Sequence, residues 1–384
     1  MTPLCRRVGI DLPVIAFSHC RDVVAAVSRG GGLGVLGAAS MSPDDLEQDL
    51  AWLDRECGRS PYGVDLLFPA KSAGDDPTDL LAQIPAGHQD FVAGLRTRLG
   101  IPLRRSEPGR TRLGGMPTEI DHLMTHANAY ALWEVVRAHP VRLVASALGP
   151  PPAPVRAAAT KLDMLVAGLV GDPRHVRHQL AAGVDVIVAQ GYEAAGHTGE
   201  ITSMVLVPQV VAAAGEVPVV AAGGIATGRQ VVAALALGAQ AVWTGSIWLA
   251  TAESDLDPVV KDKIVTAAAT DTAKTTSYTG KPTRQLTTAW TQAWRQPDAP
   301  APLASPVQQL LARDAVVSSF EHQVTPVMGS AAGQAVGLVD RVRSVASVLD
   351  DLRTGMADAV GDLTALADGD ASDVGGDAAA RAGD

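Results

Sequence analysis

The residue best suited to chemistry is His197, which stands in a turn of small residues, Gly-Tyr-Glu-Ala-Ala-Gly-His-Thr-Gly, at 191–199. This turn follows the apolar run 184–189. Turns after the strands of parallel α/β proteins often bind ligands, because glycine lets the backbone approach them closely. An imidazole there can take up a proton near neutral pH or donate a hydrogen bond to a developing anion. Most single histidines are structural or solvated, but no packing role in this turn needs an imidazole. The sequence therefore predicts that His197 is catalytic or orients the substrate.

Two later turns have the composition of a phosphate site. Gly223-Gly224 and Gly245-Ser246 each follow a Val/Ala-rich run, and a helix start at Thr227 follows the first pair. Bare N–H groups, a hydroxyl and a helix N-terminus are what a phosphate monoester needs. Plain barrel turns are the alternative. A reactive side chain beside two such turns suggests an enzyme with a phosphorylated cofactor.

Other chemistries lack their motifs. The glycine run at 30–34 follows a helix and precedes a strand, the reverse of a dinucleotide-binding loop. Ser203 has no Gly-x-Ser-x-Gly context, so serine hydrolysis is unsupported. The three cysteines are unpatterned, and no residues have metal-ligand spacing. We therefore expect no bound metal and no disulfide framework.

The elements that must position these turns are expected strands that alternate with expected helices. The apolar runs do not alternate strictly with polar residues, which indicates strands buried on both faces. Eight βα units point to an α/β fold, a (βα)8 TIM barrel, with a doubly wound sheet as the alternative. The expected strands are 13–16, 34–38, 62–67, 141–146, 163–168, 185–189, 217–222 and 240–244.

The spacing breaks after the third strand, where an insertion at about 70–120 is polar and rich in Pro and Gly. Helices are expected at 89–99 and 118–138. An insertion after a strand's carboxyl end lies on the active-site face of a barrel, so it is either a lid or a variable surface excursion.

The chain divides, on this interpretation, into a barrel at 1–295, a helical extension at 296–366 and an acidic tail at 367–384. A helix within 307–328 is expected to pack back on the barrel, and the amphipathic pattern at 336–366 suggests docking or self-association in a homodimer. The tail is too poor in apolar residues to order itself.

The composition limits the partners. The 384 residues are 47% hydrophobic and carry a net charge of −10, which allows a large core and argues against nucleic acid as a partner. No apolar run is long enough to span a membrane, and the N-terminus has no signal pattern. We therefore expect a cytoplasmic protein that acts on a small molecule.

The run 183–248 resembles the nitronate monooxygenase (2-nitropropane dioxygenase-like) family of FMN-dependent barrel enzymes. The likeness is carried by 183–199, by Val-Pro-Val-Val-Ala-Ala-Gly-Gly-Ile at 217–225, and by Ala-Leu-Ala-Leu-Gly-Ala at 234–239. It extends more loosely over 8–295. The resemblance implies an FMN-binding TIM barrel in which His197 is the active-site histidine. It also implies that the FMN phosphate binds at Gly223, Gly224, Gly245 and Ser246, and that Gln190 and Ala195 lie near the reactive edge of the isoalloxazine.

Three positions depart from the family's pattern around the flavin. Ala16-Phe17-Ser18 stands where the family usually has Ala-Pro-Met, and Asp65 stands where it often has asparagine. Ala195-Gly196 replaces its usual glycine pair. By position, Ala16, Asp65 and Gly196 join the expected cofactor-binding residues.

The resemblance implies an FMN-dependent oxidoreductase that oxidises alkyl nitronates with O2. His197 would hydrogen-bond the nitro oxygens, or remove the α-proton of a neutral nitroalkane. The first alternative is an NAD(P)H-dependent flavin reductase acting on an unsaturated carbonyl, such as an enoyl thioester, or on a quinone. The second is a non-catalytic protein that binds a phosphate-bearing ligand.

Overall fold

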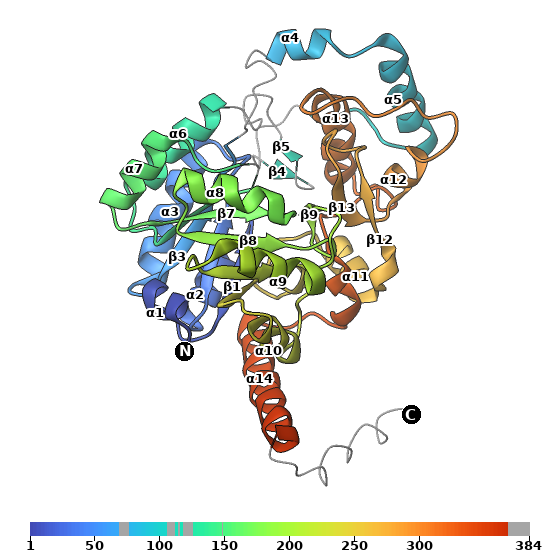
Figure 1. The fold of residues 1–384 in the computed structure, drawn as a ribbon. Helices are drawn as coiled ribbons and strands as arrows, with labels where there is room; N and C mark the ends of the chain where they lie inside the picture. The colour runs from blue at the N-terminus through green and yellow to red at the C-terminus, as the bar shows by residue number, and fades with distance from the viewer. Residues whose placement is uncertain (69–76, 106–111, 114–115, 118–125, 148, 368–384) are drawn as a thin grey trace, which may run out of the picture.

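Eight parallel strands close into a barrel in the computed structural model, which describes residues 1–68, 77–105, 112–113, 116–117, 126–147 and 149–367 (Figure 1). Each strand overlaps one expected from the sequence, so the (βα)8 prediction is confirmed and the doubly wound alternative is wrong. In barrel order the strands are β1 (Val14–Ser18), β11 (Ala241–Thr244), β10 (Val219–Ala222), β8 (Val186–Gln190), β7 (Leu165–Val170), β6 (Leu143–Ser146), β3 (Tyr62–Asp65) and β2 (Leu33–Gly37).

Side chains along the strands alternate between the barrel interior and the surrounding helices. On β1, Ile15 lies in the interior cluster, whereas Val14 and Ala16 pack against the helix layer. Both faces are thus buried, which explains the continuous apolar runs. The helix α1 (Pro3–Val8) contributes Leu4 and Val8 to the interior cluster.

The outer helices begin where capping residues predict. At α3, the Ser42 hydroxyl accepts from the Asp45 N–H, and at α10, Thr227 forms a capping box with Gln230. The layer consists of α2 (Arg21–Arg29), α3 (Pro43–Cys57), α6 (His126–Val136), α7 (Ala153–Lys161), η2 (Pro173–His175), α8 (Val176–Ala182), α9 (Ser203–Ala214) and α10 (Gly228–Ala236).

A second hydrophobic core lies beside the barrel. It is built around Trp290, Trp294 and Phe320, and it includes Val92 and Leu95 from the insertion. Residues 250–295, which the sequence interpretation assigns to the barrel unit, therefore supply much of a separate core. The elements that follow β11 are η3 (Ser246–Trp248), α11 (Pro258–Thr266), η4 (Ala269–Asp271), β12 (Thr272–Thr275), β13 (Thr283–Leu286), α12 (Ala289–Ala293), α13 (Val307–Glu321) and η5 (Gln334–Leu338).

The insertion carries α4 (Pro77–Ala82), α5 (Ala86–Leu99) and the short strands β4 (Arg112–Leu113) and β5 (Met116–Pro117). The helix expected at 89–99 is α5. Of the helix expected at 118–138, residues 118–125 lie outside the described residues, and α6 covers 126–136.

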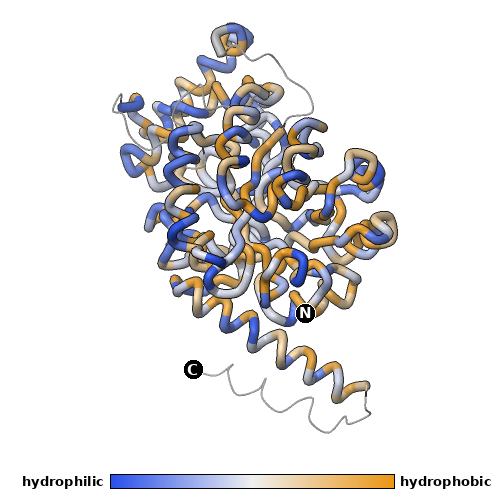
Figure 2. The backbone as a smooth tube through the Cα atoms, turned by 90° about the vertical axis from the view of Figure 1, so that its left-hand side faces the viewer, coloured by the Kyte–Doolittle hydropathy of each residue, from blue (hydrophilic) through white to orange (hydrophobic). Residues whose placement is uncertain are grey.

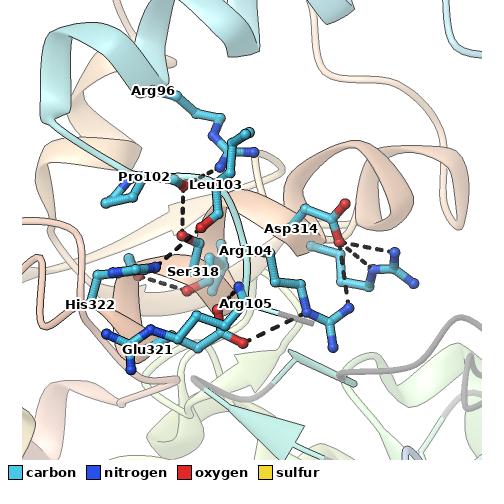
Figure 3. Close-up of polar contacts among 12 residues, drawn as sticks. Arg96, Pro102, Leu103, Arg104, Arg105, Asp314, Ser318, Glu321 and His322 are labelled. Carbon is cyan, nitrogen blue, oxygen red and sulfur yellow. Dashed lines mark hydrogen bonds and ion pairs between the residues drawn. The ribbon is translucent and has the colours of Figure 1, made fainter. Parts of the chain in front are cut away.

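The segment after α5 is fixed to α13 by polar contacts (Figure 3). Ser318 Oγ donates to the Pro102 carbonyl at 2.7 Å, and His322 Nε2 lies 3.1 Å from the Leu103 carbonyl oxygen. The Arg105 N–H donates to Glu321 Oε2 at 2.8 Å. This part of the insertion therefore packs on the C-terminal helical region.

The helix α14 (Val345–Ala367) packs on α10 and α2 and then runs away from the barrel (Figures 1 and 2). Glycines permit this close approach, because a Cβ at Gly228 would lie 2.3 Å from the Met356 nitrogen. Arg229 forms an ion pair of 2.6 Å with Asp362. The predicted disordered tail falls, from residue 368 onward, outside the described residues. None of the described helices is long and apolar enough to cross a membrane.

Candidate active site

Aromatic side chains line the carboxyl-terminal mouth of the barrel. Phe17, which faces the interior on β1, stacks on Trp243 with ring centroids 6.3 Å apart. The ring of His19 meets the edge of Phe17 at 5.0 Å, and its Nδ1 lies 2.8 Å from the Gly37 carbonyl oxygen. The sequence interpretation did not single out Phe17 or His19 as site residues. The sequence signal that could have identified them is their position directly after the first expected strand, 13–16.

Two predicted cofactor residues, Ala16 and Asp65, differ in the direction of their side chains. Ala16 is fully buried against the helix layer, so its side chain cannot face a ligand in the barrel. Asp65 pairs in register with Gly37 and Ala145, and Ala145 belongs to the interior cluster. Its Oδ1 is buried and accepts no hydrogen bond from the described residues, and burial raises the pKa of Asp65 to about 7. Asp65 therefore offers an unsatisfied carboxyl group to a bound molecule.

A hydrogen bond across the turn after β8 fixes its shape. Gln190 shares the face of Ala222 across the ladder, so it points into the barrel mouth, and its amide donates to the Ala195 carbonyl at 3.4 Å. Gly196 has φ +69°, a left-handed conformation that suits glycine. The turn thereby brings Gln190, Ala195 and the following histidine to one place.

The position of His197 is set by strand pairing. Gly196 and His197 form β9 (Gly196–His197), which pairs antiparallel with β13 so that His197 lies opposite Thr283. His197 Nε2 lies 3.1 Å from Thr279 Oγ1, in the loop between β12 and β13. Nδ1 makes no hydrogen bond with the described residues.

His197 is held neutral. Burial lowers its pKa to about 4, and the positive charge of Lys281 contributes in the same direction. The imidazole is thus uncharged at neutral pH. Thr279 and Lys281, which the sequence interpretation missed, come from a hairpin about eighty residues downstream, and no local motif marks them.

The two glycine turns lie side by side because β10 and β11 are neighbours in the barrel. Gly223 and Gly224 have φ +104° and +73°, which only glycine adopts readily. A Cβ at Gly245 would meet nothing within 4 Å, so open space faces this turn. Within the described residues, the N–H groups of Gly224 and Ser246 donate to no backbone carbonyl. These features fit a phosphate group.

Further contacts stiffen the two glycine turns. The Gln230 amide donates to the Gly224 carbonyl at 2.9 Å, and its oxygen accepts from the Ala226 N–H at 2.8 Å. Ser246 Oγ, buried to 7% exposure, accepts from the Gly333 N–H at 2.9 Å. These hydrogen bonds fix the backbone of both glycine turns.

Glu193 connects the histidine turn to the Gly223-Gly224 turn through Ser203, and the sequence interpretation did not single it out. Its carboxylate accepts from the Ser203 N–H at 2.9 Å, and Ser203 Oγ lies 2.9 Å from both Glu193 Oε2 and the Gly223 carbonyl oxygen. Ser203 thus has a structural role here.

The family model for nitronate monooxygenase matches residues 12–355. The chain belongs to this family. Its match covers the barrel, the second core and the first part of α14, so the family pattern includes both the histidine turn and the residues that support it.

Similar proteins agree with this assignment. A protein named as a monooxygenase in Mycobacterium tuberculosis is 47% identical over 378 residues, covering 95% of this chain and 99% of that protein. A protein named as a nitronate monooxygenase in Staphylococcus saprophyticus is 31% identical over 296 residues, covering 72% of this chain and 76% of that protein.

Among solved structures, a nitroalkane oxidase from Streptomyces ansochromogenes matches with a TM-score of 0.77 and 27% identity, covering 94% of this chain and 99% of that one. FabK from Thermotoga maritima matches with a TM-score of 0.70 and 27% identity, covering 95% and 99%. This nitronate monooxygenase family member is therefore an oxidoreductase of the nitronate monooxygenase type.

Proposed function

We propose that this protein binds FMN and oxidises alkyl nitronates with O2. The observation that carries the proposal is the placement of a neutral, partly buried His197 beside two glycine turns of fixed backbone shape at the mouth of one barrel. An imidazole for the substrate and a cradle for a phosphate are what a flavin-dependent oxidation of a small anion requires.

The residues present fit FMN. The glycine turns offer unpaired N–H groups at Gly224 and Ser246 for the phosphate, and Gly245 leaves space for it. The unpartnered Oδ1 of Asp65 fits a hydrogen-bonding edge of the isoalloxazine. Bound FMN would supply the redox chemistry, by accepting electrons from a nitronate, which is a resonance-stabilised carbanion.

The protein's own part is to bind and orient the substrate. His197 turns Nε2 to Thr279 Oγ1, so Nδ1 is the ring nitrogen that would meet a nitro oxygen or the α-proton of the substrate. Because the pKa of His197 is lowered to about 4, the imidazole stays uncharged throughout the neutral range. The aromatic pair Phe17 and Trp243 keeps the floor of the mouth apolar.

The test is oxygen consumption by the FMN-loaded protein with ethyl nitronate. We expect turnover that depends on added FMN and is lost in His197→Asn. Absence of turnover in protein that binds FMN would contradict the proposed activity, and failure to bind FMN would contradict the proposed cofactor.

The reductase alternative has one supporting observation, the similarity to FabK, whose TM-score is lower than that of the nitroalkane oxidase. Rapid oxidation of NADH with an enoyl thioester or a quinone, without activity on nitronates, would favour it.

A further inference from the structure

The hairpin β12–β13 carries three cations near the histidine turn, and they differ in their partners. Arg284 Nε donates to the Tyr192 carbonyl at 3.2 Å, with its guanidinium 4.4 Å from the Tyr192 ring centre. Lys274 forms an ion pair with Glu200. The Lys281 ammonium, in contrast, makes no ion pair or hydrogen bond with any residue in the described part of the chain.

Lys281 belongs to the same local network as the catalytic histidine. Its N–H donates to Thr279 Oγ1 at 3.3 Å, and this oxygen lies 3.1 Å from His197 Nε2. Two residues further on, Thr283 pairs directly with His197. The two side chains are close enough for the charge of Lys281 to lower the pKa of His197.

Lys281 is also partly withdrawn from water. Its side chain is half-buried, and this burial lowers its own pKa. An ammonium that loses hydration without gaining a carboxylate is stabilised when an anion binds beside it. The two carboxylates in and next to the histidine turn are already engaged, Glu193 by Ser203 and Glu200 by Lys274.

A nitronate and its parent nitroalkane differ in charge, so a nearby cation interacts with them differently. The nitronate already carries a negative charge on its nitro oxygens, whereas the nitroalkane is neutral and must first give its α-proton to a base. A nearby cation stabilises the anion and at the same time makes the imidazole a weaker base.

We propose that Lys281 makes this site select the nitronate anion over the neutral nitroalkane. The proposal rests on the proposed function, since it concerns the substrate of the same site. Lys281 acts by binding the nitro oxygens of the anion and by reducing the ability of His197 to accept an α-proton.

The experiment compares Lys281→Met with Lys281→Arg, which keeps the charge, and with Lys274→Met, which removes a cation of the same hairpin that already has a partner. The kcat and KM of each FMN-loaded variant are measured with ethyl nitronate and with nitroethane. Circular dichroism and FMN affinity check that each variant folds and binds FMN.

We expect Lys281→Met to raise KM for ethyl nitronate about tenfold or more and to lower the preference for nitronate over nitroethane by a similar factor. Lys281→Arg should retain most of the preference, and Lys274→Met should leave it unchanged. An unchanged preference in Lys281→Met, while the wild type oxidises nitronate, would overturn the proposal. A wild type that turns over neither substrate would instead contradict the proposed function.

A second measurement does not depend on turnover. The pKa of His197 is followed by NMR in protein with labelled histidine rings, using His197→Asn to identify its signal. Loss of the Lys281 charge should raise this pKa, whereas Lys274→Met should not. No rise in Lys281→Met would overturn the electrostatic part of the proposal.

Discussion

The backbone N–H of Gly333 donates a hydrogen bond of 2.9 Å to Ser246 Oγ, which joins the C-terminal region to the Gly245-Ser246 turn of the barrel. The next residue extends the connection, because the Gln334 N–H donates to the Glu193 carbonyl at 2.9 Å. One short segment thus contacts both the Gly245-Ser246 turn and the histidine turn. The region after the barrel therefore helps to build the candidate active site.

Gly333→Ala should weaken FMN binding. A Cβ at Gly333 would lie 2.6 Å from the Glu193 carbonyl oxygen and 3.0 Å from the Ala195 nitrogen, and both are backbone atoms that cannot move alone. We expect the FMN dissociation constant to rise about tenfold, a change of about 1.4 kcal/mol, as measured by quenching of flavin fluorescence. Gly94→Ala, on α5 with nothing within 4 Å of its Cβ, is the matched control. Equal affinity in Gly333→Ala and the wild type would argue against this segment's role.

The two glycine turns should respond differently to alanine. Gly224 has φ +73°, so Gly224→Ala should cost about 1–2 kcal/mol of unfolding free energy as well as FMN affinity. Gly245 has φ −132° and open space at its Cβ, so Gly245→Ala should fold normally and lose FMN affinity alone. Urea unfolding and FMN titration of the same two proteins test this contrast. Full FMN affinity in Gly245→Ala would place the phosphate elsewhere.

Replacing the histidine should remove most of the activity and change its pH dependence. We expect His197→Asn to lower kcat/KM for nitronate about a hundredfold. In the wild type the imidazole has a pKa lowered to about 4, so its protonation should reduce activity only as the pH falls toward that value. A pH profile of kcat/KM for both proteins is the measurement. Loss of activity near the ordinary histidine pKa would show that His197 is not held neutral as described.

Asp65 should make the FMN-free protein less stable at higher pH. Its pKa is about 3.8 unfolded and about 7 folded, so the unfolded chain binds fewer protons between these values. Stability is therefore greatest below this range and falls as the pH rises through it. Asp65→Asn should remove this loss, as thermal unfolding at about pH 5 and about pH 8 would reveal. Asp358→Asn, on the exposed side of α14, is the control. An equal pH dependence in Asp65→Asn and the wild type would contradict the burial of an unpaired carboxyl group.

Much of the fold could be predicted from local sequence patterns. Buried strands in a parallel barrel read as continuous apolar runs, and the capping residues Ser42 and Thr227 mark helix starts through their own side-chain hydrogen bonds. The glycine turns were also visible, since Gly223 and Gly224 need conformations that other residues avoid. These features depend on residues close in sequence.

The rest of the site depends on contacts between distant residues. The expected loop at His197 contains a short strand, β9, that exists only through pairing with β13. Thr279, Lys281 and Gly333 reach the site through this pairing and through the second core, and nothing beside them in sequence indicates it. Ala16 shows another limit, because a shift of one position along a strand moves a side chain to the other face, and here Phe17 faces the barrel.

The most direct test of the central claim is anaerobic mixing of the FMN-loaded protein with ethyl nitronate and, separately, with NADH, while flavin absorbance is followed by stopped flow. The proposed function predicts rapid bleaching by the nitronate and little by NADH. Bleaching by NADH alone would contradict it and favour the reductase.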